Sequence, residues 1–281
     1  MTQRNFLDID SLAAEAQSYV GHPQFDTAMQ AFCGGLADFH SIARSRRTGV
    51  VDTITWAVAV LVLYLDAHAP HGANTSKIVA ICAEGGLGGA TAVRNAIALL
   101  RQGGMIAVDH SPGAGRAHRL HPTPGLIETM QDNLAVRFAA MEHVIAWPKP
   151  AEEWARTDGV LEAFVRGNVE AYRCDRYTLF QDFPEIRVFM DRHCGYIVLM
   201  ESLAQIEISP KGGSTVLTLS EIAQKFTISR AHIRKLFAAA AAREWLCFES
   251  GGRLMFRPEA LARYRLWFGY EFAWARRLVE M

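Results

Sequence analysis

The sequence predicts a mainly α-helical protein with short β-hairpins, assembled from two similar halves. Three observations support this prediction. Apolar residues recur at helical spacing in both halves, as they do between Met29 and Phe39. Strand signals are few, and the clearest is a pair of bulky apolar runs that flank Ser250-Gly251-Gly252. A segment of the first half also aligns with a segment of the second, which indicates an internal repeat.

Composition limits the class of protein. The chain has 281 residues, half of them hydrophobic, which is enough for two domains with sizeable cores. Lys plus Arg and Asp plus Glu are 29 each, so the net charge is zero; this argues against a surface coated with positive charge but permits a local basic face. Five scattered cysteines, no apolar signal core and no run long enough for a bilayer are typical of a cytoplasmic protein without a membrane span.

A break in the helical pattern divides the chain. The stretch WPKPAEEWARTDG contains two prolines and several charges. We interpret residues 147–159 as a linker between an N-terminal domain, residues 1–146, and a C-terminal domain, residues 160–281. Each domain is expected to have its own leading helices.

The second half contains the clearest local pattern. Thr218 and Glu221 have the spacing of a capping box at the start of a short helix. A tight connection follows, and Ser229 is placed to cap the next helix, whose inward positions include Ile233 and Phe237. The predicted hairpin comes next. Helix, short turn, helix and hairpin is the order of a winged helix-turn-helix, in which the second helix enters the major groove of DNA.

The first half repeats this order. Arg94 aligns with Arg234, and the segment GGMIAVDHS aligns with AREWLCFES. After a longer loop, RLHPTPGLIETM aligns with RLMFRPEALARY, so that Pro124 and Pro258 each open a terminal helix.

A glycine-rich stretch, EGGLGGAT, precedes the second helix of the first half. It lacks the lysine of a phosphate-binding loop, and the dinucleotide-binding spacing fails at Thr91. In the alignment, Gly88-Gly89-Ala90 take the place of Thr227-Ile228-Ser229. We therefore expect the glycines to permit a sharp turn and close helix packing rather than to bind a nucleotide.

Each half resembles the MarR-type winged-helix fold, with a leading helix, a helix-turn-helix, a hairpin called the wing, and a long terminal helix. The segment GRAHRLHPTPGLIETM is similar to that family's arginine-bearing wing and following helix, and LSEIAQKFTISRAHIRKL matches a general helix-turn-helix pattern. The resemblance implies a transcriptional regulator that binds double-stranded DNA. Members are usually single-copy homodimers, so the duplication implies a tandem winged helix that forms a pseudo-dimer within one chain.

Positive charge gathers on the two motifs. From Ser220 to Arg265 there are nine Lys or Arg and four Glu residues, and from Leu87 to His121 there are four Arg and one Asp. Arginine can read guanine, and both cations can hold phosphate. The predicted DNA-binding residues are Ser229, Arg230, His232, Arg234, Lys235 and Arg253 in the second half, and Thr91, Arg94, Asn95, Arg116 and His118 in the first.

The last helix carries an aromatic stripe, which we expect to lie in the core or at an interface. Terminal helices form the dimer in MarR-like proteins. The resemblance therefore implies that residues 124–144 and 258–278 help join the two halves about an approximate two-fold axis, with both recognition helices on one side. The stripe consists of Tyr264, Trp267, Phe268, Phe272 and Trp274.

No residue set with the context of a catalytic triad, an activated cysteine or a carboxylate pair is recognisable, so we expect neither an enzyme nor a cofactor. Asp109, His110, His118 and His121 match no closed zinc pattern, and we expect no metal. A small-molecule effector and a homodimer stay open. Two alternative functions also remain: a winged-helix scaffold for protein interactions without a DNA function, and a plasmid-type replication initiator.

Overall fold

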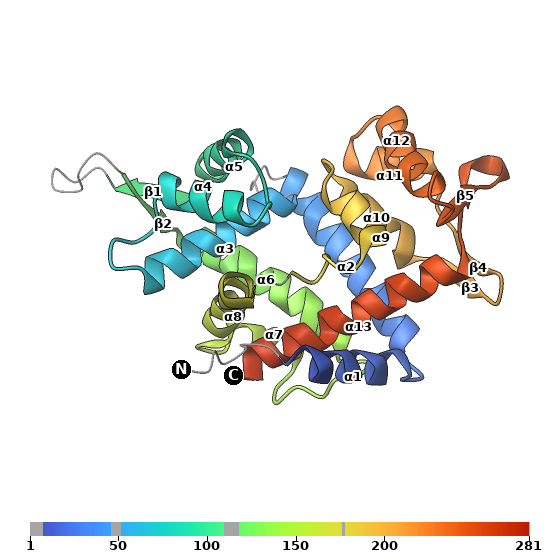
Figure 1. The fold of residues 1–281 in the computed structure, drawn as a ribbon, viewed down its shortest axis with the longest axis horizontal. Helices are drawn as coiled ribbons and strands as arrows, with labels where there is room; N and C mark the ends of the chain where they lie inside the picture. The colour runs from blue at the N-terminus through green and yellow to red at the C-terminus, as the bar shows by residue number, and fades with distance from the viewer. Residues whose placement is uncertain (1–7, 46–51, 110–117, 176–177, 281) are drawn as a thin grey trace.

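The structure is a computed structural model that describes residues 8–45, 52–109, 118–175 and 178–280. It is mainly helical, with short strands at two ends of the molecule (Figure 1). The first half contains α1 (Ile9–Val20), α2 (Phe25–Ser45), α3 (Thr53–His68), α4 (Thr75–Glu84), α5 (Ala90–Gln102), β1 (Ile106–Asp109), β2 (Arg119–Pro122) and α6 (Pro124–Met141). The second contains α7 (Ala151–Ala155), α8 (Val160–Asp175), α9 (Pro184–Met190), α10 (Gly195–Ala204), β3 (Ile206–Ser209), β4 (Gly212–Thr215), α11 (Leu219–Phe226), α12 (Arg230–Ala241), β5 (Leu246–Phe248), the short 3₁₀ turn η1 (Ser250–Gly252), β6 (Leu254–Phe256) and α13 (Pro258–Glu280). A mainly α fold with short hairpins is therefore confirmed.

Both sheets are antiparallel. Strands β1 and β2 pair as a hairpin, and the second sheet has the order β3-β4-β6-β5. The hairpin predicted around residues 250–252 is β5-β6, whereas the hairpin β3-β4 was not predicted from the sequence. In the first half, a single bridge between Ala73 and Leu120 takes the place of the β4-β6 pairing.

Two groups of elements share one chain order. We call α3, α4, α5, β1, β2 and α6 the α5 unit, and α10, α11, α12, β5, β6 and α13 the α12 unit. Their backbones agree in detail. Gly104 and Glu244 both follow the second short helix with positive φ, at 72° and 60°. The next residues, Met105 and Trp245, each donate a backbone hydrogen bond to a carbonyl five residues earlier.

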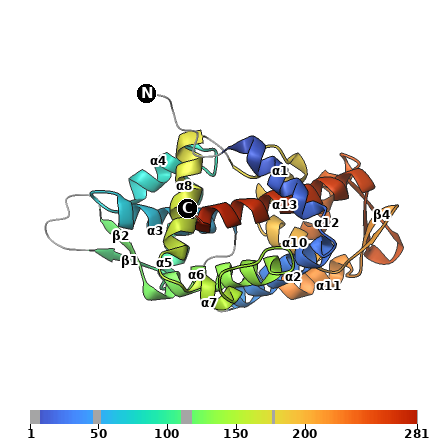
Figure 2. The same ribbon diagram turned by 90° about the horizontal axis from the view of Figure 1, so that it is seen from below.

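The leading helices of each half pack against the opposite half. Helix α1 lies along α13, and α2 packs against both α6 and α10. In the same pattern, α7 packs against α6, and α8 packs against α13 and α3. Figure 2 shows α13 running through the middle of the molecule between these elements. The predicted linker, residues 147–159, thus contains helix α7, and the two halves share one large core.

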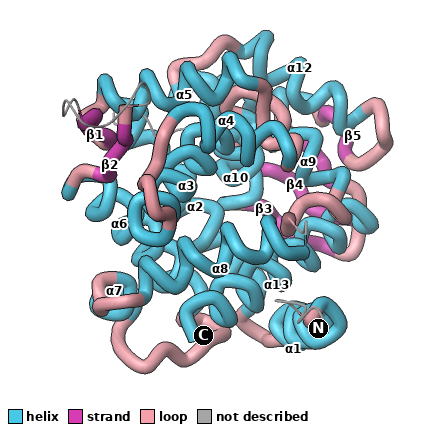
Figure 3. Tube along the Cα trace, turned by 60° about the vertical axis from the view of Figure 1, so that its left-hand side comes forward, coloured by secondary structure: helices cyan, strands magenta, loops and turns pink. Residues whose placement is uncertain are grey.

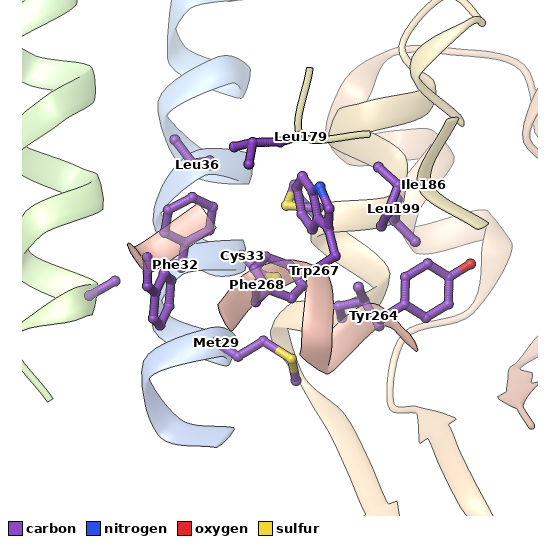
Figure 4. Close-up of a cluster of buried hydrophobic side chains, with 14 of the residues drawn as sticks. Met29, Phe32, Cys33, Leu36, Leu179, Ile186, Leu199, Tyr264, Trp267 and Phe268 are labelled. Carbon is purple, nitrogen blue, oxygen red and sulfur yellow. The ribbon is translucent and has the colours of Figure 1, made fainter. Parts of the chain in front are cut away.

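The aromatic stripe of α13 lies in this shared core. Trp267 and Phe268 are 1% and 0% exposed, as the sequence led us to expect. Figure 4 shows them beside Phe32 and Cys33 of α2, which belongs to the first half. Gly269 permits the close approach of α1, because a Cβ there would lie 2.6 Å from the carbonyl oxygen of Ala16. Among the described residues, no helix is both long and apolar enough to cross a membrane.

Candidate nucleic-acid interface

Helix α12 begins and packs as the sequence predicts. The side chain of Ser229 accepts a hydrogen bond from the backbone N–H of His232 at 3.1 Å, which caps the helix. Ile233, Leu236 and Phe237 are fully or almost fully buried. This inward face fixes which side of α12 is turned to solvent.

The solvent face of α12 is basic. Arg230, Arg234 and Lys235 are all exposed. None of the three forms a hydrogen bond or ion pair with the residues that the structure describes, so their charges are available to a polyanion. The guanidinium carbon of Arg234 lies 5.9 Å from the ring centre of Phe248, which belongs to β5. This contact holds one cation beside the hairpin.

His232 is directed to a different neighbour. One ring nitrogen lies 3.0 Å from the carbonyl oxygen of His193, in the turn between α9 and α10. The His193 ring in turn approaches the carboxylate of Asp52, the N-cap of α3, at 3.9 Å. His232 therefore fixes the start of α12 against the rest of the molecule, and the other predicted α12 residues form the more exposed surface.

Arg253 lies in the β5-β6 hairpin, the hairpin whose Phe248 contacts Arg234. Gly251 and Gly252 make the turn with φ values of 81° and 84°, and Arg253 follows them in an exposed position. The backbone N–H of Glu249 donates to the Arg253 carbonyl at 3.0 Å and closes the hairpin.

The helix before α12 starts with the predicted capping box. The pKa of Glu221 is below its usual value, chiefly because the backbone N–H of Thr218 donates to its carboxylate, and then because the Thr218 hydroxyl donates as well. The positive charge of Arg253 adds a smaller lowering. The ionised carboxylate thus holds the first turn of α11.

Helix α5 has the same buried register as α12 but a different solvent face. Thr91, Arg94 and Asn95 are exposed, as predicted. Its N-cap, Gly89, offers no side chain to the helix start, in contrast to Ser229. Of the three predicted residues on α5 only Arg94 is charged. The solvent face of α5 therefore carries fewer charges than that of α12, where Arg230, Arg234 and Lys235 are exposed.

The β1-β2 hairpin of the α5 unit is described only at its base. Arg116 lies outside the described residues, whereas His118 is described and exposed. Arg119 and His121 both contact the carboxylate of Asp66 on α3, at 3.1 and 2.9 Å. These contacts attach β2 to α3, so Asp66 and Arg119 support the hairpin rather than extend the exposed basic surface.

The glycine-rich turn is explained by packing. A Cβ on Gly85 would lie 1.1 Å from the hydroxyl oxygen of Tyr172, which reaches across from α8 and donates to the Ile81 carbonyl at 3.2 Å. Gly86, with φ of 63°, corresponds to Thr227, with φ of 52°, because the next residue in each unit makes the same backbone hydrogen bond. The alignment that placed Gly88 opposite Thr227 was therefore wrong; the residue opposite Thr227 is Gly86.

The two exposed helices lie on one side of the molecule. Figure 1 shows α5 and α12 along the same upper edge, and Figure 3, turned about the vertical axis, shows the same placement. A cavity of about 520 Å³ lies between the glycine-rich turn that precedes α5 and the segment of residues 178–193. The arrangement leaves the solvent faces of α5 and α12 accessible from one direction.

The described residues contain no group of three or more His, Cys, Asp or Glu side chains placed to hold a metal ion. No family model matches the chain, and neither the curated proteins nor the solved structures include a significant match to it.

Proposed function

We propose that this chain is a cytoplasmic, DNA-binding transcriptional regulator composed of two winged helix-turn-helix units, and that both units contact one double-stranded DNA. The observation that carries the proposal is the matched placement of α5 and α12. Both helices bury the same register of apolar residues, both expose an arginine at the fifth helical position, Arg94 and Arg234, and both lie on the same side of the molecule.

The chemistry of the two faces suits a duplex. An α-helix fits the major groove, where arginine can form two hydrogen bonds with guanine and asparagine can do so with adenine. Arg234 and Asn95 are exposed at positions where such contacts can form. Arg230 and Lys235 on α12 and Arg253 on the hairpin are exposed and can neutralise phosphates, which would orient α12 in the groove.

The leading helices give the two units a fixed relation. Helix α2 packs against both α6 and α10, and α8 packs against both α13 and α3, so the two units cannot separate without losing these contacts. A single chain would thus present two recognition helices as a homodimer does, but with different side chains. The DNA site should accordingly be asymmetric rather than a perfect palindrome.

A scaffold for protein interactions is the second candidate. The balanced net charge and the weakly charged face of α5 favour it. A replication initiator of the plasmid type would share the DNA contacts, and it would be distinguished by the location of its site rather than by the chemistry of binding.

Selection of binding sites from a random double-stranded pool tests the proposal. Wild-type protein should enrich a sequence, and Arg234→Ala should weaken binding to that sequence by about 1–3 kcal/mol, measured by fluorescence anisotropy. Lys149→Ala is the matched control, because Lys149 is exposed near α7 and contacts only Glu153 among the described residues. If no sequence is enriched, or if Arg234→Ala binds as tightly as the control, α12 is not a DNA-reading helix.

A further inference from the structure

The two units differ at one position that lies next to the exposed arginine. In the α12 unit, Phe248 of β5 is opposite Leu254 of β6. In the α5 unit, Val108 of β1 is opposite Leu120 of β2. Leu120 and Leu254 are equivalent and both buried, so Val108 and Phe248 occupy the same place in the two hairpins. The sequence alignment had paired Asp109 with Phe248 and was out of register by one residue.

The arginines beside these two positions are also equivalent. Gly89 and Ser229 are the N-caps of α5 and α12, and Arg94 and Arg234 are each five residues further on. The guanidinium of Arg234 lies over the Phe248 ring at 5.9 Å. Arg94 has only the smaller, aliphatic Val108 at the corresponding position.

We propose that Phe248 is a positioning residue that holds the Arg234 guanidinium for base recognition, so that the α12 unit discriminates between bases more sharply than the α5 unit. This inference rests on the proposed function. When a guanidinium lies against a ring, the orientation of its plane is fixed and its N–H groups point outward. Two parallel hydrogen bonds to guanine need this geometry. An arginine without such support must be ordered when it binds, which costs side-chain entropy.

The surroundings support a positioning role for Phe248. The ring is 37% exposed, which is unusual for a large apolar side chain in this protein, and it is one of few such residues among those described. Its neighbour Glu249 is held by the Ser214 hydroxyl at 2.8 Å, so the end of β5 is attached to β4. The ring is therefore presented from a fixed strand and not from a loose loop.

The α5 unit has room for the missing ring. A shallow groove between α5 and β1 is lined by Ala98, Arg101 and Val108. A phenylalanine at position 108 can lie along this groove without displacing a buried side chain.

Base discrimination at each position of the selected site tests the inference. The position read by Arg234 is the one where Arg234→Ala removes discrimination. At that position, Phe248→Leu should lower the preference for guanine by about two- to five-fold, the loss expected for one exposed cation–π contact. Phe248→Tyr keeps a ring and should keep the wild-type preference. In an Arg234→Lys background, Phe248→Leu should change the preference no further, because lysine has no planar fork to orient.

A merely structural role for Phe248 predicts another result. It would lower the melting temperature and weaken binding to all sequences equally, with the ratio between bases unchanged. That result would overturn the inference, as would a Phe248→Leu variant with the wild-type ratio. Val108→Phe supplies a gain-of-function test. It should raise discrimination at the position read by Arg94 by a similar factor, and an unchanged ratio in the folded variant would contradict the role given to the ring.

The two failures are distinguishable. If wild-type protein enriches no site, the proposed function fails before Phe248 is tested. The second case is one in which wild-type protein discriminates between bases, Arg234→Ala abolishes that discrimination and Phe248→Leu retains it. In that case only the inference about Phe248 fails.

Discussion

Adding one methyl group at Gly85 should disrupt the contact between the two halves. Gly85 has φ of −95° and ψ of −2°, so Gly85→Ala does not force alanine into the left-handed region that favours glycine. The new Cβ would instead lie 1.1 Å from the Tyr172 hydroxyl oxygen and 1.9 Å from the ring carbon that carries it. The ring must then leave its position and lose its hydrogen bond to the Ile81 carbonyl.

The size of the effect follows from these changes. Overpacking of a well-filled site costs about 1–3 kcal/mol, and loss of the hydrogen bond costs about 1 kcal/mol. Alanine also lowers the conformational entropy of the unfolded chain, which stabilises the folded protein by about 0.4–1 kcal/mol. We expect Gly85→Ala to lower the free energy of unfolding by about 1–3 kcal/mol, measured by urea denaturation.

Gly89→Ala is the matched control, because no atom lies within 4 Å of a Cβ at Gly89 and its φ of −74° is also open to alanine. It should change stability by less than about 1 kcal/mol, since the weaker N-cap preference of alanine is offset in the unfolded state. A double-mutant cycle with Tyr172→Ala completes the test. Gly85→Ala should become nearly neutral once the ring is absent. An equal loss in both backgrounds would refute the packing explanation of the glycine-rich turn.

Two further predictions concern the shared core and the capping box. Trp267→Ala should lower the free energy of unfolding by about 3–5 kcal/mol, because the side chain is 1% exposed. Ile9→Ala, at a residue that is 46% exposed, should change it by less than about 0.5 kcal/mol. Equal effects of the two substitutions in urea denaturation would contradict the shared core. Glu221 has a folded pKa below its unfolded value, so its carboxylate contributes stability above the unfolded pKa of about 4.3, and that contribution disappears as the pH falls through the folded value. The melting temperature of wild type should therefore exceed that of Glu221→Gln at neutral pH and converge with it in acid, and a constant difference between the two would rule out this linkage.

Local chemistry in the sequence predicted much of the fold. The capping box at Thr218, the cap at Ser229 and the hairpin at residues 250–252 all depend on neighbouring residues, and all three are present. The burial of Trp267 also followed from helical spacing, because an apolar stripe on one face must be covered.

Contacts between distant segments could not be predicted in this way. Gly85 is glycine because Tyr172 packs on it from α8, and nothing near Gly85 in the sequence identifies that partner. His232 looked like an exposed α12 residue, but its ring meets the His193 carbonyl, which precedes it by 39 residues. The place of Phe248 beside Arg234 depends on strand register, and the alignment misplaced that register by one residue.

The salt dependence of binding tests the central claim most directly. The affinity of wild-type protein for its selected duplex would be measured over a series of salt concentrations, with Lys235→Ala and Lys149→Ala alongside. Release of counterions from three to four phosphates predicts a slope of log affinity on log salt of about −3. Lys235→Ala should make that slope shallower by about 1, and Lys149→Ala should leave it unchanged. A slope near zero, or the same slope for all three proteins, would contradict DNA binding by the basic face of α12 and would favour the interaction scaffold.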